Sequence, residues 1–230
     1  MFYFDPLYFV FALPALLLAF YAQFKVQSSY RRYLQVPNQQ GISGLEAAKR
    51  LLYANDLSDV RIEGARGELT DHYDPRTQTL RLSAGVARSN SVAALGIVAH
   101  EVGHAVQDAT AYAPLKLRSG LVPMVNIGSW LGPILFVVGL LFNSPNLAWV
   151  GVVAFAGSLV FAFITLPVEF NASRQAVRML QTSGLVSQAE LRGARSVLSA
   201  ASLTYVAAVA QALSTLLYYI FLLTGSRRRD

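Results

Sequence analysis

Four long stretches of this chain are apolar and carry no charge, and they constrain its fold more than any other feature. A helix needs about 20 mostly apolar residues to cross the hydrocarbon core of a bilayer. Each stretch has about that length, so the sequence predicts a mainly α-helical membrane protein with about four transmembrane helices. The stretches are residues 7–24, 121–142, 147–166 and 203–223.

Most charged residues lie between the first and second apolar stretches. Residues 25–118 hold twelve of the nineteen Lys and Arg residues and nine of the thirteen Asp and Glu residues, which predicts a polar lobe. The net charge of +6 favours contact with anionic lipid. No nucleic-acid-binding motif is present, so we expect no nucleic-acid partner. The chain has no cysteine, which excludes disulfides and thiolate ligands for a metal.

Within this lobe, residues 100–104 have the pattern His-Glu-x-x-His. On a helix, His100 and His104 lie on one face, about 6 Å apart along the axis, where two neutral imidazoles can bind one Zn²⁺. Glu101 is then placed to take a proton from a zinc-bound water as general base. The alternative is a chance pair of helix histidines, but burying His-Glu-His without a metal is costly. We therefore predict Zn²⁺ as the cofactor.

Local signals place the motif on its own helix behind a β-hairpin. Ser43 and Glu46 form a capping box that predicts a helix over residues 44–55. Asn90 or Ser91 caps the motif helix, which we expect over residues 91–108. Short strands are predicted at 60–62, 68–73 and 79–83, the last two joined as a hairpin by a turn at 74–77. An edge strand beside the metal could bind an extended peptide by main-chain pairing.

Glu169 is the best-placed third ligand, because a catalytic zinc site needs three protein ligands and keeps one position open. It follows the third apolar stretch, where an acidic residue needs a partner. Pro167 is expected to end that stretch and to start a new helix that runs to about residue 182. The alternative for Glu169 is a carboxylate that faces the N-terminal dipole of this helix.

Four other residues are candidates for lesser roles. His72 is either a substrate or oxyanion contact or a strand residue held by a nearby aspartate. Asp108 either orients His104 from behind or ends its helix in solvent. Arg174 could pair with Glu101 or a substrate carboxylate, or could be an ordinary surface residue. Tyr205 is a further candidate for contact with the oxyanion.

A further helix is expected over residues 187–201, before the fourth span. The predicted division of the chain is an N-terminal anchor (1–24), a catalytic lobe (25–119), a transmembrane hairpin (120–168), a helical segment with Glu169 (169–201), and a last span with a basic tail (202–230). Nine basic residues near the span ends fall on the side of the lobe, and Arg227, Arg228 and Arg229 fall on the other. This excess predicts a lobe that faces the cytoplasm, with the tail as a conflict unless the last helix does not span.

Between about residues 43 and 205 the chain resembles the bacterial membrane-bound, YugP-like neutral zinc metallopeptidases. The resemblance is carried by the motifs at residues 69–75, 100–107, 112–115, 121–123, 166–170 and 203–205. It implies His100, His104 and Glu169 as zinc ligands and Glu101 as the catalytic residue. Such members tend to carry Asp where this chain has Asn171. Asn171 is therefore a candidate for a position behind the ligands, but a carboxylate role does not transfer to it.

The resemblance and the motif together predict a zinc-dependent endopeptidase with a small α+β zincin-like catalytic lobe. We expect it to act in the bacterial inner (plasma) membrane, on peptide bonds of membrane or membrane-proximal proteins, by means of a zinc-activated water. The alternative is a non-catalytic zinc-binding membrane scaffold. The sequence gives neither the physiological substrate nor the oligomeric state.

Overall fold

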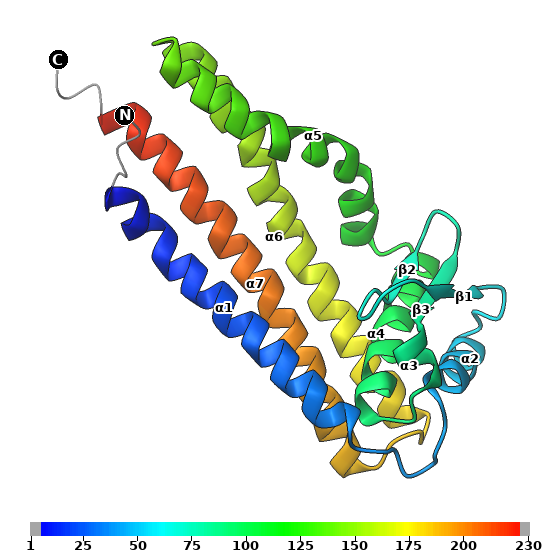
Figure 1. Cartoon of the computed structure of the whole chain (residues 1–230). Coiled ribbons are helices and arrows are strands. Elements are labelled where there is room, and N and C mark those ends of the chain that lie inside the picture. Colours follow the sequence, from blue (N-terminus) through cyan, green and yellow to red (C-terminus); the bar gives the residue numbers. More distant parts are fainter. Residues whose placement is uncertain (1–5, 226–230) are drawn as a thin grey trace. The chain divides into compact units, whose positions relative to one another are not determined.

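A computed structural model describes residues 6–225, so the predicted basic tail lies outside the described residues. The described chain is mainly helical, with one small sheet (Figure 1). In chain order the elements are α1 (Pro6–Leu34), α2 (Gly44–Ala54), β1 (Arg61–Ala65), β2 (His72–Asp74), β3 (Thr79–Ser83), α3 (Ala84–Arg88), α4 (Val92–Ala109), α5 (Ala113–Leu141), α6 (Pro145–Thr182) and α7 (Gln188–Gly225).

The chain forms two compact units, and the long helices pass from one to the other. The helical unit comprises residues up to Ala22, residues 117–166 and residues from Thr204 onward. The sheet unit comprises residues 23–116 and 167–203, and it contains α2, α3, α4 and all three strands.

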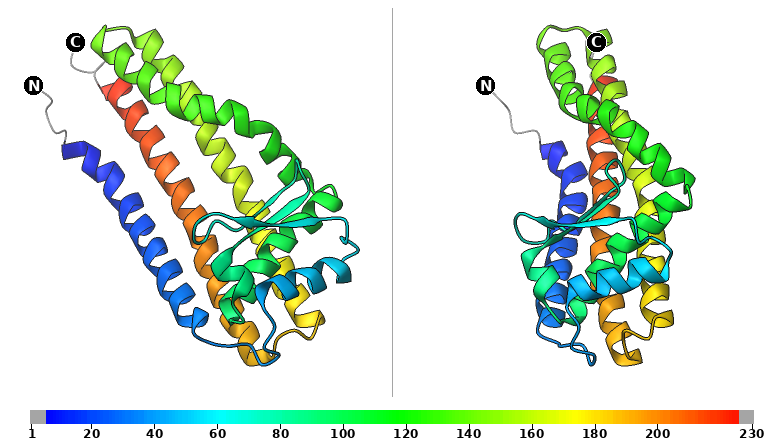
Figure 2. Two further views of the ribbon diagram at one scale, coloured as in Figure 1. Left: turned by 45° about the vertical axis from the view of Figure 1, so that its right-hand side comes forward. Right: turned by 90° about the vertical axis from the view of Figure 1, so that its right-hand side faces the viewer.

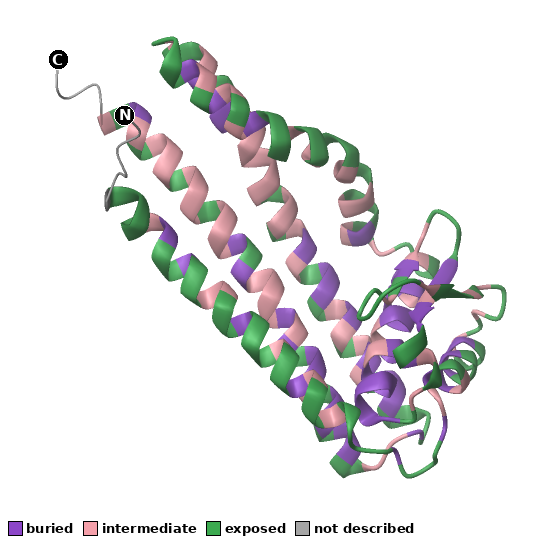
Figure 3. Cartoon of the chain, viewed as in Figure 1, coloured by how far each residue is buried: buried purple, intermediate pink, exposed green. Residues whose placement is uncertain are grey.

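The four apolar stretches lie in α1, α5, α6 and α7, each long and apolar enough to cross a membrane, as the sequence predicts. Large apolar side chains such as Phe20, Trp130 and Val153 are exposed on them, as lipid-facing side chains would be (Figure 3). Within the helical unit α5 and α6 approach closely. A Cβ at Gly128 would lie 2.7 Å from the carbonyl oxygen of Ala154, so only glycine fits there.

Two predicted helix boundaries are wrong. Pro167 does not end the third span, because α6 continues through it to Thr182. A proline removes one backbone hydrogen bond, and long apolar helices tolerate that loss. The helix predicted at 187–201 and the last span are likewise one 38-residue helix, α7. Residues 201–203 are Ala, Ser and Leu, and none of them interrupts a helix.

The sheet has the order β1-β3-β2, with β1 parallel and β2 antiparallel to β3. The predicted hairpin is therefore confirmed, and Asp74 stabilises its turn by accepting hydrogen bonds from Arg76 N and Thr77 Oγ1. The second strand is shorter than predicted. Gly67 and Leu69 have φ angles of 98° and 54°, which strand geometry excludes, so residues before His72 form a loop.

The motif helix α4 lies at the centre of the sheet unit, and β2 and β3 pack against it (Figures 1 and 2). Ser91 caps it by accepting a hydrogen bond from Ala94 N at 3.1 Å, as predicted. Most of α4 is buried (Figure 3). One apolar core joins Val98 of α4 to Leu51 of α2, Leu80 of β3, Leu180 of α6 and Leu198 of α7. The sheet unit thus holds segments far apart in the sequence against one helix.

Candidate metal centre

The two motif histidines and Glu169 form one cluster inside the sheet unit. The rings of His100 and His104 lie on one face of α4, with centroids 4.8 Å apart. Glu169, on α6, is 1% exposed. Its Oε2 lies 3.2 Å from His100 Nε2 and 3.6 Å from His104 Nε2. The structure therefore brings together three of the residues singled out in the sequence.

A glycine allows α6 to lie this close to α4. A Cβ at Gly103 would come within 2.8 Å of the carbonyl oxygen of Ala172, so any larger residue would force the helices apart. Gly103 lies between the two motif histidines in register with Ala172, which is three residues after Glu169. The close contact thus sets the distance between the imidazoles and the carboxylate.

The other ring nitrogen of His104 is held by a buried amide that the sequence analysis missed. His104 Nδ1 lies 3.0 Å from Gln107 Oε1. The amide nitrogen of Gln107 donates at 2.7 Å to Val168 O and at 2.9 Å to Asn171 Oδ1. A backbone carbonyl only accepts, so Gln107 must present its oxygen to His104. Nδ1 therefore carries the hydrogen, and the Nε2 lone pair faces Glu169.

The second imidazole is oriented by a chain of two hydroxyl groups. Ser202 Oγ donates to Leu198 O at 2.9 Å, and Ser173 Oγ lies 3.4 Å from Ser202 Oγ. Ser173 can then donate to Ser202 and accept from His100 Nδ1, which lies 3.2 Å away. In this arrangement both neutral imidazoles carry their hydrogen on Nδ1 and turn an Nε2 lone pair toward the carboxylate.

The donor set fits a zinc ion. The ligand atoms of His100, His104 and Glu169 all lie within 4.8 Å of one another. Two ligands on a tetrahedral zinc with bonds of 2.0–2.1 Å are about 3.3 Å apart, close to the 3.2 and 3.6 Å found between the carboxylate and the imidazoles. Two imidazoles and one carboxylate, with the outer imidazole nitrogens hydrogen-bonded, form a donor combination that zinc accepts in proteins.

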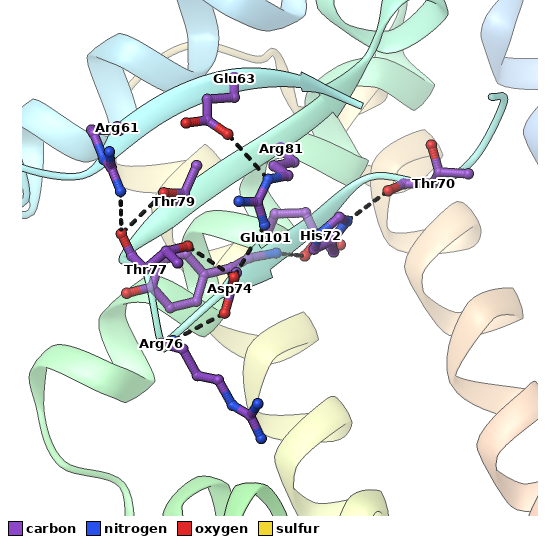
Figure 4. A network of polar contacts seen from close by, with 11 residues as sticks. Arg61, Glu63, Thr70, His72, Asp74, Arg76, Thr77, Thr79, Arg81 and Glu101 are labelled. Carbon is purple, nitrogen blue, oxygen red and sulfur yellow. Dashed lines mark hydrogen bonds and ion pairs between the residues drawn. The ribbon is translucent and has the colours of Figure 1, made fainter. Parts of the chain in front are cut away.

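Glu101 is also buried but points to the strand instead of joining the donor set. Its Oε2 accepts a hydrogen bond of 3.0 Å from the backbone N–H of Tyr73 in β2 (Figure 4). Burial raises the pKa of Glu101 above its ordinary value, although neighbouring positive charge on the imidazoles opposes the shift. A carboxylate with a raised pKa is suited to accepting a proton near neutral pH.

The pKa of His104 is also perturbed. Burial acts to lower it, but the nearby carboxylates of Glu169 and Glu101 favour the charged imidazole and raise the pKa above the usual range. A proton and a metal ion compete for the same nitrogen, so metal affinity is expected to fall in acid.

Three other predicted site residues, His72, Asp108 and Arg174, do not belong to the group of three donors. His72 is exposed on β2 with Nδ1 2.8 Å from Thr70 O, not held by an aspartate (Figure 4). Asp108 accepts a hydrogen bond of 2.9 Å from Tyr73 Oη, while Gln107 occupies the position behind His104. Arg174 is exposed on α6. Tyr205 lies on α7 in the helical unit, and its role remains a prediction.

Asn171 does lie behind the ligands, but through its amide oxygen. Asn171 Oδ1 accepts hydrogen bonds from Gln107 at 2.9 Å and from Gln175 at 2.6 Å. An aspartate would accept the same two bonds, so the amide preserves the geometry without the charge. The sequence held signals for the missed groups, since Gln107 is three residues after His104 and Ser173 is four after Glu169, on the same helix faces.

Comparison with known proteins identifies the class. The chain matches the family described as "Putative neutral zinc metallopeptidase" over residues 8–224, and it belongs to that family. It is 43% identical to "Putative membrane protease YugP" of Bacillus subtilis (strain 168) over 215 residues, which cover 94% of this chain and 96% of that protein. No solved structure matches the chain. The relative and the four apolar helices together indicate a membrane protein.

Proposed function

We propose that this protein is a zinc-dependent endopeptidase whose sheet unit is a zincin-like catalytic lobe. The observation that carries the proposal is the separation of two carboxylates. Glu169 lies among the imidazole nitrogens, whereas Glu101 is buried beside them and held by the strand. A purely structural zinc site has no use for a second buried carboxylate, and it usually closes with four protein ligands.

Zinc, held by His100, His104 and Glu169, would polarise the scissile carbonyl group and lower the pKa of a water molecule toward about 7. Because Glu101 Oε2 accepts from Tyr73 N, its Oε1 is available to take the proton of the attacking water. Glu101 then passes this proton to the nitrogen of the leaving amine as the peptide C–N bond breaks. Gln107 and Ser173 accept hydrogen bonds from the Nδ1–H groups of His104 and His100, and this would keep the two imidazoles in the required tautomer.

The substrate class follows from the strand and the membrane. β2 is an edge strand of the sheet and lies directly beside Glu101, which favours an extended peptide bound by main-chain pairing. Since the catalytic helix lies in a chain with four apolar helices, we propose membrane or membrane-proximal proteins as substrates.

Glu101→Gln tests the proposal. We expect the purified chain to cleave a quenched fluorescent peptide library, and Glu101→Gln to lower the rate at least about a hundredfold while bound zinc stays the same. Glu68→Gln, which makes the same change on an exposed loop, is the matched control and should leave both unchanged. Equal rates for Glu101→Gln and the wild type would favour the alternative, a non-catalytic zinc-binding scaffold.

Glu169→Gln tests the ligand set separately. An amide oxygen binds zinc poorly, so we expect most of the bound zinc to be lost, as measured by elemental analysis of the dialysed protein. Zinc retained at the wild-type level would remove Glu169 from the ligand set without contradicting the role of Glu101.

We further propose that the sheet unit faces the cytoplasm from the bacterial inner membrane, as the excess of basic residues on its side favours. The chain has no cysteine, so single cysteines report orientation directly. Tyr53→Cys lies on the sheet unit and Asn146→Cys at the start of α6, and both positions are exposed. A membrane-impermeant maleimide should label only Asn146→Cys in intact cells, and labelling of only Tyr53→Cys would reverse the orientation.

A further inference from the structure

Away from the metal centre, the sheet unit contains a polar hollow of about 280 Å³ between α1 and α7. Two basic side chains and several hydroxyl groups line it, and none of its lining residues is acidic. The lining includes Lys25, Ser29, Arg32, Ser196 and Ser199. The hollow therefore has the composition of a site for an anion.

The positive charge of the hollow is not balanced by ion pairs. Among the described residues, no carboxylate lies within ion-pair distance of Lys25 or Arg32, and the Arg32 guanidinium lies 5.5 Å from the centre of the Tyr33 ring. The acidic residue of this part of α7, Glu190, accepts hydrogen bonds of 2.6 Å from the backbone N–H groups of Gln39 and Ser187. An anion would thus meet basic groups that have no competing acidic partner.

The hollow also offers a hydrogen-bond donor. The hydroxyl oxygens of Ser29 and Ser196 lie 3.1 Å apart, and either can donate to the other. The hydroxyl that accepts in this pair still carries its own hydrogen. Lys25 and Arg32 are seven residues apart, so both project from the same face of α1, about 10 Å apart along the axis. Their long side chains can reach one tetrahedral anion between them.

The position of the hollow along α1 and α7 indicates the source of the anion. In α1 no charged residue precedes Lys25, and in α7 none follows Arg195 up to Gly225. Both uncharged runs therefore end at the hollow. In a membrane that places it at the depth of the lipid headgroups, where basic pockets between helices bind anionic lipids.

We propose that this hollow binds the phosphate group of an anionic phospholipid headgroup. Lys25 and Arg32 supply the charge, and the pair of Ser29 and Ser196 supplies a neutral donor. The same chemistry would suit a free phosphate ion, but a lipid reaches this depth by lateral diffusion and buries its chains beside the apolar parts of the helices. The inference does not depend on the proposed peptidase activity.

The test uses the full-length chain in a neutral detergent, titrated with short-chain phosphatidylglycerol, short-chain phosphatidylcholine or inorganic phosphate. We expect phosphatidylglycerol to raise the melting temperature in a saturable way, at concentrations at least about tenfold below those required for phosphatidylcholine. Inorganic phosphate should give no comparable rise. A rise with inorganic phosphate at the same concentrations, or equal effects of the two lipids, would overturn the proposal.

Two variants examine the site itself. The double variant Lys25→Gln/Arg32→Gln should weaken phosphatidylglycerol binding at least about tenfold, since each basic group near a membrane surface contributes about fivefold. Lys49→Gln/Arg66→Gln removes the same two charges at exposed positions elsewhere in the sheet unit and should bind as the wild type does. If both double variants weaken phosphatidylglycerol binding equally, the attraction is a general effect of charge and the proposed site is refuted.

Ser199→Phe fills the hollow while leaving its charges in place. We expect it to lose selective phosphatidylglycerol binding although its bound zinc and its melting temperature without lipid remain near those of the wild type. Those two measurements also show that each variant is folded. Undiminished binding by folded Ser199→Phe would contradict a built site.

Discussion

Tyr73 makes two hydrogen bonds to α4, and the one to Glu101 links the edge strand to the proposed catalytic carboxylate. Its backbone N–H donates to Glu101 Oε2 at 3.0 Å, and its hydroxyl group donates to Asp108 Oδ2 at 2.9 Å. Glu101 and Asp108 are seven residues apart, two turns along one helix face. A single strand residue thus fixes α4 at two points, and the strand that we expect to bind substrate also orients the carboxylate that we propose as general base.

The first prediction concerns the stability that this contact provides. Tyr73→Phe removes the hydroxyl group and leaves the carboxylate of Asp108 without its donor, so we expect a loss of about 1–2 kcal/mol in the free energy of unfolding. The backbone bond to Glu101 is retained. Denaturant unfolding in detergent measures the effect. Tyr53→Phe, whose side chain is 78% exposed, is the matched control and should change little.

The same residue predicts a dependence on alkaline pH. Burial raises the pKa of Tyr73 above its ordinary value, and the hydrogen bond to Asp108 adds to the shift. The folded state thus favours the neutral Tyr73 hydroxyl group. The stability that this group provides is complete below about pH 10, where the tyrosine of the unfolded chain ionises. It is lost as the pH rises from there toward the higher pKa of the folded state. The stability difference between the wild type and Tyr73→Phe should therefore shrink above pH 10. A constant difference from pH 8 to 11 would contradict the assignment.

Local patterns in the sequence were sufficient for the parts of the fold that depend on neighbouring residues. The capping serines Ser43 and Ser91, the turn after Asp74 and the spacing of the motif histidines all act within a few residues, and each was predicted. The continuity of α6 through Pro167 was not predicted, because it depends on how well a long apolar helix tolerates one missing backbone hydrogen bond.

The groups behind the ligands depend on tertiary contacts. The approach of α6 to α4 at Gly103 brings Ala172 and its neighbours alongside the motif, and no local pattern encodes that distance. Gln107 and Asp108 follow His104 by three and four residues, so helical spacing alone does not decide which of them contacts the imidazole. Ser202 could not have been predicted, since it reaches His100 only through Ser173 on another helix.

Metal binding should stabilise the sheet unit. The three donors come from α4 and α6, so the site exists only in the folded chain, and zinc at 100 times its dissociation constant should add about 2.7 kcal/mol to stability. We expect a chelator to lower the melting temperature and added zinc to restore it. His100→Ala should melt at the same temperature with and without the chelator. A zinc-dependent rise that survives in His100→Ala would mean that the stabilising metal binds elsewhere.

Gln107 should matter for metal affinity rather than for substrate binding. Gln107→Leu keeps a similar volume but removes the acceptor of the His104 Nδ1–H, so that imidazole loses its fixed tautomer. We expect zinc affinity to fall about 10- to 100-fold in chelator competition. Gln40→Leu, at an exposed position of the same unit, controls for loss of an amide. An unchanged affinity in folded Gln107→Leu would show that the amide only packs behind the ring.

The hydroxyl chain behind His100 gives the most specific prediction. Ser173→Ala removes the acceptor of His100 Nδ1 and should weaken zinc affinity about tenfold. Ser202→Ala should have a smaller effect, because Ser202 acts on the imidazole only through Ser173. Ser202→Ala should therefore have no further effect once Ser173 is already alanine, and a double-mutant cycle on zinc affinity measures this coupling. Additive losses would mean that Ser202 influences the metal centre by a route other than Ser173, and the proposed direction of the hydrogen bonds would be wrong.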